Sequence, residues 1–207
     1  MSSDRVPWVV GVSGASGTPY AKAVIAALLQ AGEPVDLIVS RAARLTLLDE
    51  TGIAFRDNHW SADLASWLGT AGDAPADLRY WTATDLAAGP ASGSYRTRGM
   101  VVVPASTAAV AGIALGLSKD LLQRAADVTL KERRPLVLAT RETPLNLIHI
   151  RNMETATLAG ATILPPVLAF YHRPQTIDDL LAHLVGKVLD QFGLPHHTYR
   201  RWGDSAD

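Results

Sequence analysis

Short apolar runs recur along the chain, and each is followed by a turn and then by apolar residues at helical spacing. The runs cover residues 8–12, 35–39, 100–103, 136–139 and 161–164. Apolar runs of this length, bounded by turn residues, are typical of buried parallel strands. The segments between them repeat apolar residues every three or four positions, as Tyr20, Val24 and Leu28 do. Strands that alternate with helices predict an α/β protein, with a mainly parallel sheet and helices on both of its faces.

Capping residues mark where the predicted helices begin. Pro19 suits a first helical turn, and Ser16 or Thr18 is the expected cap there. Further helices are predicted over residues 41–51, 107–116, 121 to about 131, 147–160 and from 177 onward. The caps expected for three of these are Ser40, Asp120 and Thr176.

The least regular stretch covers residues 52–95. It holds three of the five tryptophans and ends in a run rich in glycine and serine, residues 89–94. We predict a short helix, an edge strand and a loop for it. The whole chain, residues 1–207, is expected to form one domain. A tryptophan in a terminal segment, Trp202, predicts that the tail from about residue 193 docks on its own domain or on a neighbouring subunit, and we expect the neighbouring subunit.

Composition narrows the function mainly by exclusion. The formal net charge of -1 gives no basic surface for nucleic acid. The absence of cysteine excludes disulfides, a thiolate metal site and a cysteine nucleophile. The six histidines show no convincing metal-ligand spacing, so no metal is expected. No apolar run is long enough to cross a bilayer, and the short polar N-terminus is unlike a signal peptide, so we expect a cytoplasmic protein.

Small hydroxyl residues stand at several predicted strand ends. A glycine-rich turn, residues 14–17, follows the first strand, and free N–H groups at such a helix start favour an anion. Serines at three strand ends, Ser16, Ser40 and Ser106, add to this pattern. Each serine could simply cap a helix. Three together favour a phosphate or cofactor cleft beyond the carboxyl ends of the strands.

Charged residues follow a later strand. Arg141 and Glu142 come directly after the strand at 136–139, which places them at the edge of the expected cleft. An arginine there can bind phosphate, and a glutamate can donate or accept a proton. The denser charge at 131–134 is, in its simplest interpretation, a solvated helix end. Tyr171 is either a wall of the cleft or a core aromatic residue.

A series of sequence blocks matches a known family. The chain resembles the UbiX-type flavin prenyltransferases over nearly its whole length, most specifically in L-K-E-R-R-P-L-V-L and F-Y-H-R-P-Q. The matching blocks begin at Gly11, Ala91, Val103, Arg124, Leu130, Arg141, Pro165, Phe170 and Arg201. The resemblance implies a flavodoxin-like or Rossmann-like three-layer fold, a homo-oligomer (usually a dodecamer) and no metal. It also implies transfer of a dimethylallyl group from dimethylallyl phosphate to reduced FMN, with the prenylated flavin passing to a UbiD-type decarboxylase.

The resemblance also assigns residues to roles. The flavin contacts that it implies are Gly14, Ala15, Ser16, Ser40, Ser106, Thr107, Ala108, Ala109, Arg124 and Arg141. The prenyl-phosphate contacts are Ser92, Gly93, Lys131, Arg141, Tyr171 and Lys187, with Trp202 as an aromatic wall that reaches a neighbouring subunit. The residues expected to assist catalysis are Glu50, Glu142 and Ser16.

The chain departs from the family pattern at a few positions. Ala105 stands where a cysteine is common, and Leu86 where some members have a tryptophan. Ala108 and Ala109 replace a Lys-Thr or Gly-Thr pair, so any flavin contact there uses the backbone. Lys187 fills a position often held by arginine, which keeps the charge and loses the bidentate fork.

The sequence alone leaves two other functions open. One is an FMN-dependent decarboxylase of the cysteine-decarboxylating flavoproteins, whose flavin loop resembles Pro104-Ala105-Ser106, although the expected asparagine after it is absent. The other is a non-catalytic flavin carrier. A carrier has no use for the full set Lys131, Glu142, Tyr171 and Lys187.

Overall fold

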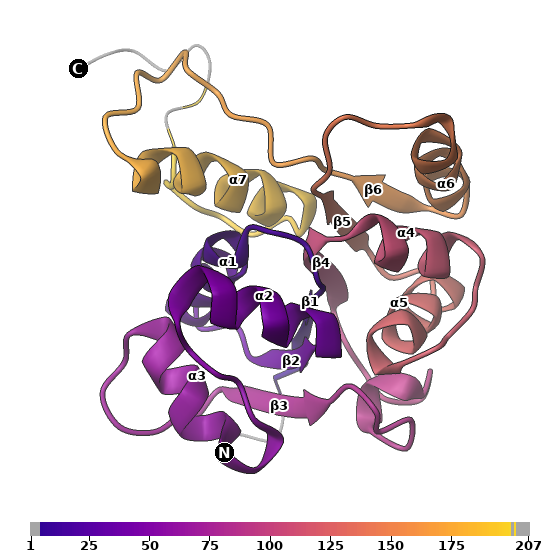
Figure 1. Ribbon diagram of the computed structural model, residues 1–207, viewed down its shortest axis with the longest axis horizontal. Helices are drawn as coiled ribbons and strands as arrows, with labels where there is room; N and C mark the ends of the chain where they lie inside the picture. The colour runs from indigo at the N-terminus through magenta and orange to yellow at the C-terminus, as the bar shows by residue number, and fades with distance from the viewer. Residues whose placement is uncertain (1–4, 200, 202–207) are drawn as a thin grey trace.

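A parallel sheet organises residues 5–199 and 201, the part of the chain that the computed structural model describes (Figure 1). Its six strands lie in the order β3-β2-β1-β4-β5-β6, and every neighbouring pair runs parallel. The strands are β1 (Trp8–Val12), β2 (Val35–Val39), β3 (Leu78–Thr82), β4 (Gly99–Ala105), β5 (Leu136–Thr140) and β6 (Ala161–Ile163). This order is the doubly wound, Rossmann-type order.

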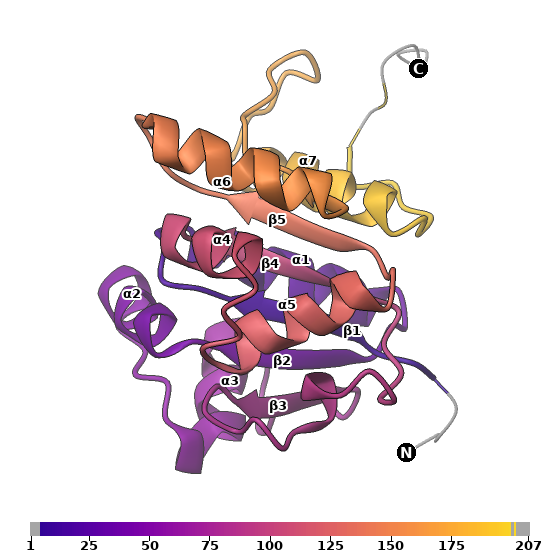
Figure 2. The ribbon, with the colours of Figure 1, turned by 90° about the vertical axis from the view of Figure 1, so that its right-hand side faces the viewer.

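Helices cover both faces of the sheet. On one face lie α1 (Thr18–Gln30), α2 (Arg41–Thr51), α3 (Trp60–Leu68) and α7 (Ile177–Gln191). On the other lie α4 (Thr107–Ala114), α5 (Leu121–Lys131) and α6 (Leu147–Leu158), which face the viewer in Figure 2. The described residues thus form three layers, as the sequence predicted.

The central strands are apolar on both sides because both sides are covered. Trp8, Val10 and Val12 belong to the core beneath α1 and α7, whereas Val9 belongs to the core beneath α5. All four are at most 2% exposed. Strands covered on both sides favour apolar residues without alternation, which explains the runs in the sequence.

Most predicted helix starts are confirmed, and one is wrong. The side chains of Ser40, Asp120 and Thr176 each accept a hydrogen bond from the backbone N–H three residues on, at 3.1, 2.9 and 3.1 Å. For α1, however, the residue at the capping position is Gly17, with a φ of 118°. Glycine has no side chain that could cap the helix. The expected cap, Ser16 or Thr18, is therefore corrected.

Two segments lie outside the regular alternation of strands and helices, residues 52–95 and the C-terminal tail. Residues 52–95 contain α3, the edge strand β3 and a loop, as predicted. The part of the tail from residue 193 to 199, with Arg201, lies on α7 of the same chain, and its docking on a neighbouring subunit stays a prediction. Trp202, for which an intersubunit role was predicted, lies outside the described residues.

Candidate active site

The strand order reverses between β1 and β4, and the chain leaves these two strands in opposite directions. Such a reversal opens a crevice at the carboxyl ends of the strands. One side chain ties the two loops together there. The Ser13 hydroxyl donates to the Pro104 carbonyl at 2.8 Å and accepts from the Ser106 N–H at 2.7 Å. Ser13 is only 2% exposed, and the sequence analysis did not single it out. Its signal was a polar residue directly after a buried strand.

Gly14 is fixed by packing within the protein. A Cβ at this position would lie 2.4 Å from the Cβ of Ala42, in the first turn of α2, and 3.0 Å from the backbone carbon of that residue. The glycine therefore lets the loop after β1 approach α2. This contact explains the glycine within the chain itself, and the predicted flavin contact of Gly14 stays a prediction.

The serines after β2 and β4 act as helix caps and keep a free donor function. Ser40 accepts from the Ala43 N–H, and Ser106 accepts from the Ala109 N–H at 3.2 Å. A serine hydroxyl that accepts one bond still has its hydrogen to donate. Thr107, with the two alanines after it, forms the first turn of α4, where backbone N–H groups favour an anion.

The Glu50 side chain caps the start of α1, the role that the sequence predicted for Ser16 or Thr18. One of its oxygens accepts from the Gly17 N–H at 2.8 Å, and the other accepts from the N–H and hydroxyl of Thr18 at 2.8 and 2.6 Å. Burial acts to raise the pKa of Glu50, but hydrogen bonds from Ser16, Thr18 and the backbone outweigh it and lower the pKa. A carboxylate thus already caps this helix start.

Glu50→Gln is expected to lower the free energy of unfolding by about 1 kcal/mol at neutral pH, because the helix loses a charged cap. The pKa of Glu50 in the folded state lies below its ordinary value of 4.5. Its contribution to stability is therefore complete above that value and is lost as pH falls through the folded-state pKa. Urea unfolding of parent and variant should show a gap at neutral pH that closes in acid. A gap that stays constant with pH would contradict this role, and Glu154→Gln, at an exposed carboxylate, is the control.

A second group of predicted residues lies around the loop that follows β3. The Arg124 guanidinium donates to the Ala91 carbonyl at 3.0 Å, and Arg134 donates to the Gly93 carbonyl at 3.0 Å. A Cβ on Gly93 would lie 2.6 Å from the ammonium of Lys131, which pairs with Glu132 at 2.5 Å. The loop that carries Ser92 and Gly93 is thus held against the C-terminal end of α5, and Arg124 acts here as an anchor.

Within one chain, Lys131 lies far from Arg141. Lys131 comes shortly before β5 begins and Arg141 directly after it ends. A strand of five residues spans roughly 15 Å, so Lys131 lies at the amino ends of the strands and Arg141 at their carboxyl ends. Arg141 and Glu142 are exposed at the crevice edge; the Arg141 N–H donates to the Ala105 carbonyl at 3.0 Å.

Tyr171 and Lys187 form a third group, against α7. The Tyr171 hydroxyl lies 3.4 Å from Nε2 of His183, and Lys187 stands one helical turn after that histidine. The Lys187 ammonium lies 3.6 Å from a carboxylate oxygen of Asp190. The set predicted for the prenyl phosphate is therefore divided among three places in a single chain.

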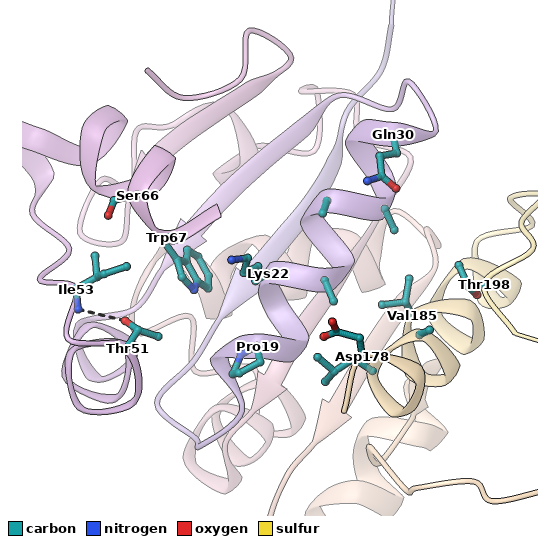
Figure 3. A pocket seen from close by; sticks show the side chains of 15 residues that line it. Pro19, Lys22, Gln30, Thr51, Ile53, Ser66, Trp67, Asp178, Val185 and Thr198 are labelled. Atoms are coloured by element: carbon teal, nitrogen blue, oxygen red, sulfur yellow. Dashed lines mark hydrogen bonds between the residues drawn. The ribbon is translucent and has the colours of Figure 1, made fainter. Parts of the chain in front are cut away.

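A separate cavity is lined by other residues. It has a volume of about 770 Å³ and runs along the outer face of α1, between α3 and α7 (Figure 3). Its floor consists largely of alanines of α1, and none of the predicted site residues lines it. Among the described residues there is no group of three or more metal-ligating side chains. Within the same part of the chain, no helix has the length and apolar character of a membrane span.

Comparison with known proteins places this geometry in context. Residues 1–189 match the family described as Flavoprotein. A flavin prenyltransferase UbiX of Streptomyces coelicolor is 61% identical over 205 residues, which cover 95% of each chain.

Two solved structures share the fold over almost the whole length. One, a crystal structure of AnUbiX in complex with FMN and dimethylallyl pyrophosphate, is 37% identical, with a TM-score of 0.83 and coverage of 97% of this chain and 99% of that one. The other is a dodecameric FMN-dependent UbiX-like decarboxylase from Escherichia coli O157:H7. It is 39% identical, with a TM-score of 0.82, and the match covers 96% of this chain and 100% of that one.

Proposed function

The chain belongs to the flavoprotein family and, within it, to the UbiX flavin prenyltransferases, and from this premise we propose that it transfers a dimethylallyl group from dimethylallyl phosphate to reduced FMN. The observation that carries the proposal is the match along 97% of the chain to a structure that holds FMN and dimethylallyl pyrophosphate together. A UbiD-type decarboxylase would use the product. A single domain over residues 1–207 and a cytoplasmic location are part of the same proposal.

The crevice at β1 and β4 fits the flavin phosphate. Ser40 and Ser106 retain hydroxyl hydrogens, and the first turn of α4 presents backbone N–H groups beside them. Ser13 holds the two loops in register. Reduced FMN supplies the nucleophile of the reaction, and the chain supplies its binding and orientation.

The other candidate residues suit the departure of phosphate. Breaking the bond between dimethylallyl and phosphate develops an allylic cation and an anionic leaving group. Lys131, Arg141 and Lys187 would stabilise the anion, and the ring of Tyr171 would face the cation. Glu142, which is exposed, would exchange a proton with solvent or with a bound group.

A second copy of the chain would bring these separated groups together. Lys131 and Arg141 lie at opposite ends of the strands in one chain, so a site that uses both needs a neighbour. Large apolar side chains of α6, and Phe170 beside Tyr171 in the sequence, are exposed, and such side chains mark interaction surfaces. They include Leu147 at 59%, Ile148 at 68%, Leu158 at 83% and Phe170 at 67%. We propose a homo-oligomer, a dodecamer like the relative from Escherichia coli.

The decisive experiment is anaerobic incubation of the purified protein with reduced FMN and dimethylallyl phosphate, followed by mass spectrometry of the released flavin. A flavin heavier by one prenyl unit is expected. Dimethylallyl pyrophosphate is the parallel donor, because the related structure holds that compound. Bound but unmodified FMN with both donors would reject the prenyltransferase and favour the flavin carrier. Release of carbon dioxide from a peptidyl cysteine would favour the decarboxylase.

A further inference from the structure

The C-terminal segment of the described chain, residues 194–199 with 201, packs along one face of α7; we name it the strap. Its ring at Tyr199 sits over Gly186, where a Cβ would lie 2.3 Å from ring carbon Cε1. Glycine in the middle of a helix is unfavourable relative to alanine. Here it provides the room that the strap occupies.

One carboxylate holds the strap in place. Asp190 accepts from the Tyr199 hydroxyl at 2.7 Å and from the Arg201 guanidinium at 2.7 Å, and Nε2 of His196 lies 3.0 Å away. Burial acts to raise the pKa of Asp190, but the bonds from Arg201, Tyr199 and His196 outweigh it and keep the pKa well below its ordinary value. Asp190 is thus an ionised anchor, one helical turn beyond Gly186.

The anchored strap touches the environment of both prenyl-phosphate candidates on this face. The Tyr199 ring lies 4.9 Å from the ring of His183, and His183 in turn contacts Tyr171. The oxygen of Asp190 that binds the Tyr199 hydroxyl is also the one 3.6 Å from the Lys187 ammonium. Tyr199 therefore connects, through one neighbour each, to Tyr171 and to Lys187.

We propose that the strap positions Tyr171 and Lys187 for the prenyl phosphate, with Tyr199 as the positioning residue and with Gly186 and Asp190 as its seat. The proposal deepens the proposed function and rests on it. In physical terms, the strap fixes the rotamer of His183 and shares the counter-ion of Lys187. Detachment would release the His183 ring that contacts Tyr171 and would leave Lys187 drawn fully to Asp190, so binding of the phosphate would weaken while flavin binding would not.

Two variants test this from different sides. Tyr199→Phe removes the hydroxyl bond to Asp190 and keeps the ring. Gly186→Ala fills the seat and expels the ring, although alanine favours the helix itself. The matched control is Tyr80→Phe. Tyr80 lies on β3, an edge strand of the sheet, and its hydroxyl also donates to a carboxylate, that of Asp57, at 2.6 Å.

Three quantities are measured on the full-length protein: KM for dimethylallyl phosphate, Kd for FMN, and the rate of tryptic cleavage after Arg201. Loss of a hydrogen bond to a charged group predicts that KM rises by about tenfold in Tyr199→Phe and at least as much in Gly186→Ala. Cleavage should accelerate in both variants, with the Kd for FMN and kcat little changed. Tyr80→Phe should match the parent in KM and cleavage.

The outcomes separate the strap from the reaction. Faster cleavage with an unchanged KM would show that the strap detaches without affecting the prenyl-phosphate site. Unchanged cleavage would show that neither Tyr199 nor Gly186 holds the strap on α7. Either result overturns the inference. A parallel loss of FMN binding and thermal stability would indicate general damage and would also overturn it. If the parent forms no prenylated flavin, the proposed function fails. The affinity of parent and variants for dimethylallyl phosphate, measured by calorimetry, then tests the role of the strap by itself. About tenfold weaker binding by the variants would support that role, and equal affinities would refute it.

Discussion

Glu142→Gln should slow flavin prenylation by about 10²- to 10⁴-fold, the range that a positioned acid or base contributes. The side chain is exposed at the crevice edge, and its hydrogen bond to the described residues is a local one, accepted from the Thr143 N–H at 3.0 Å. The amide oxygen of glutamine can accept the same bond, so the loop should keep its shape. What changes is the capacity to hold and release a proton. FMN affinity and the free energy of unfolding should therefore stay close to those of the parent.

Single-turnover rates under anaerobic conditions, with flavin and dimethylallyl phosphate saturating, give the cleanest measure. Glu154→Gln, an exposed glutamate on α6, is the matched control and should react at the rate of the parent. Equal rates for Glu142→Gln and the parent would remove Glu142 from the mechanism. Glu50 would then remain as the candidate acid or base of the crevice.

Gly14→Ala should destabilise the fold by about 1–3 kcal/mol and weaken FMN binding together, because overpacking in a tight contact forces the backbone to move. The added Cβ would lie 2.4 Å from Ala42, and the backbone carbon of Ala42 at 3.0 Å leaves little room for adjustment. The loop after β1 must shift away from α2. Since Ser13 joins this loop to the one after β4, the displacement should reach the flavin crevice.

A double-mutant cycle with Ala42→Gly isolates the contact. Removing the methyl group of Ala42 relieves the closest approach, so Gly14→Ala with Ala42→Gly should recover part of both the stability and the FMN affinity. Urea unfolding and flavin fluorescence titration provide the two readouts. Strictly additive effects would mean that the clash is not the cause, and that Gly14 is needed for the ligand itself.

Much of the fold was determined locally, which is why the sequence predicted it. Strands buried on both faces are mostly apolar, so they appear as nearly continuous runs; Asp36 of β2 is a buried exception that accepts a hydrogen bond from Tyr95. Ser40, Asp120 and Thr176 cap their helices through a bond to the N–H three residues on, and this bond depends only on the adjacent sequence. Alternation of these elements then allows few arrangements other than a parallel sheet between two layers of helices.

The cap of α1 shows where local information ends. Glu50 reaches Gly17 and Thr18 across more than thirty positions of sequence, through the packing of α2 beside α1. Ser13 likewise joins two loops more than ninety residues apart. No periodicity or spacing reports such contacts, because they depend on how finished elements are placed against each other.

The candidate site divides in the same way. The sequence by itself determined which residue types are present, that Ser40, Ser106 and Arg141 follow strands, and that these strand ends share one edge of the sheet. Only the tertiary structure decided that Lys131 and Gly93 lie at the amino ends of the strands, and that the strap returns to α7 through Gly186 and Asp190. The physical reason is that strand ends are ordered by the hydrogen-bonded sheet, whereas loops and tails are placed by side-chain contacts that form only after the layers have packed.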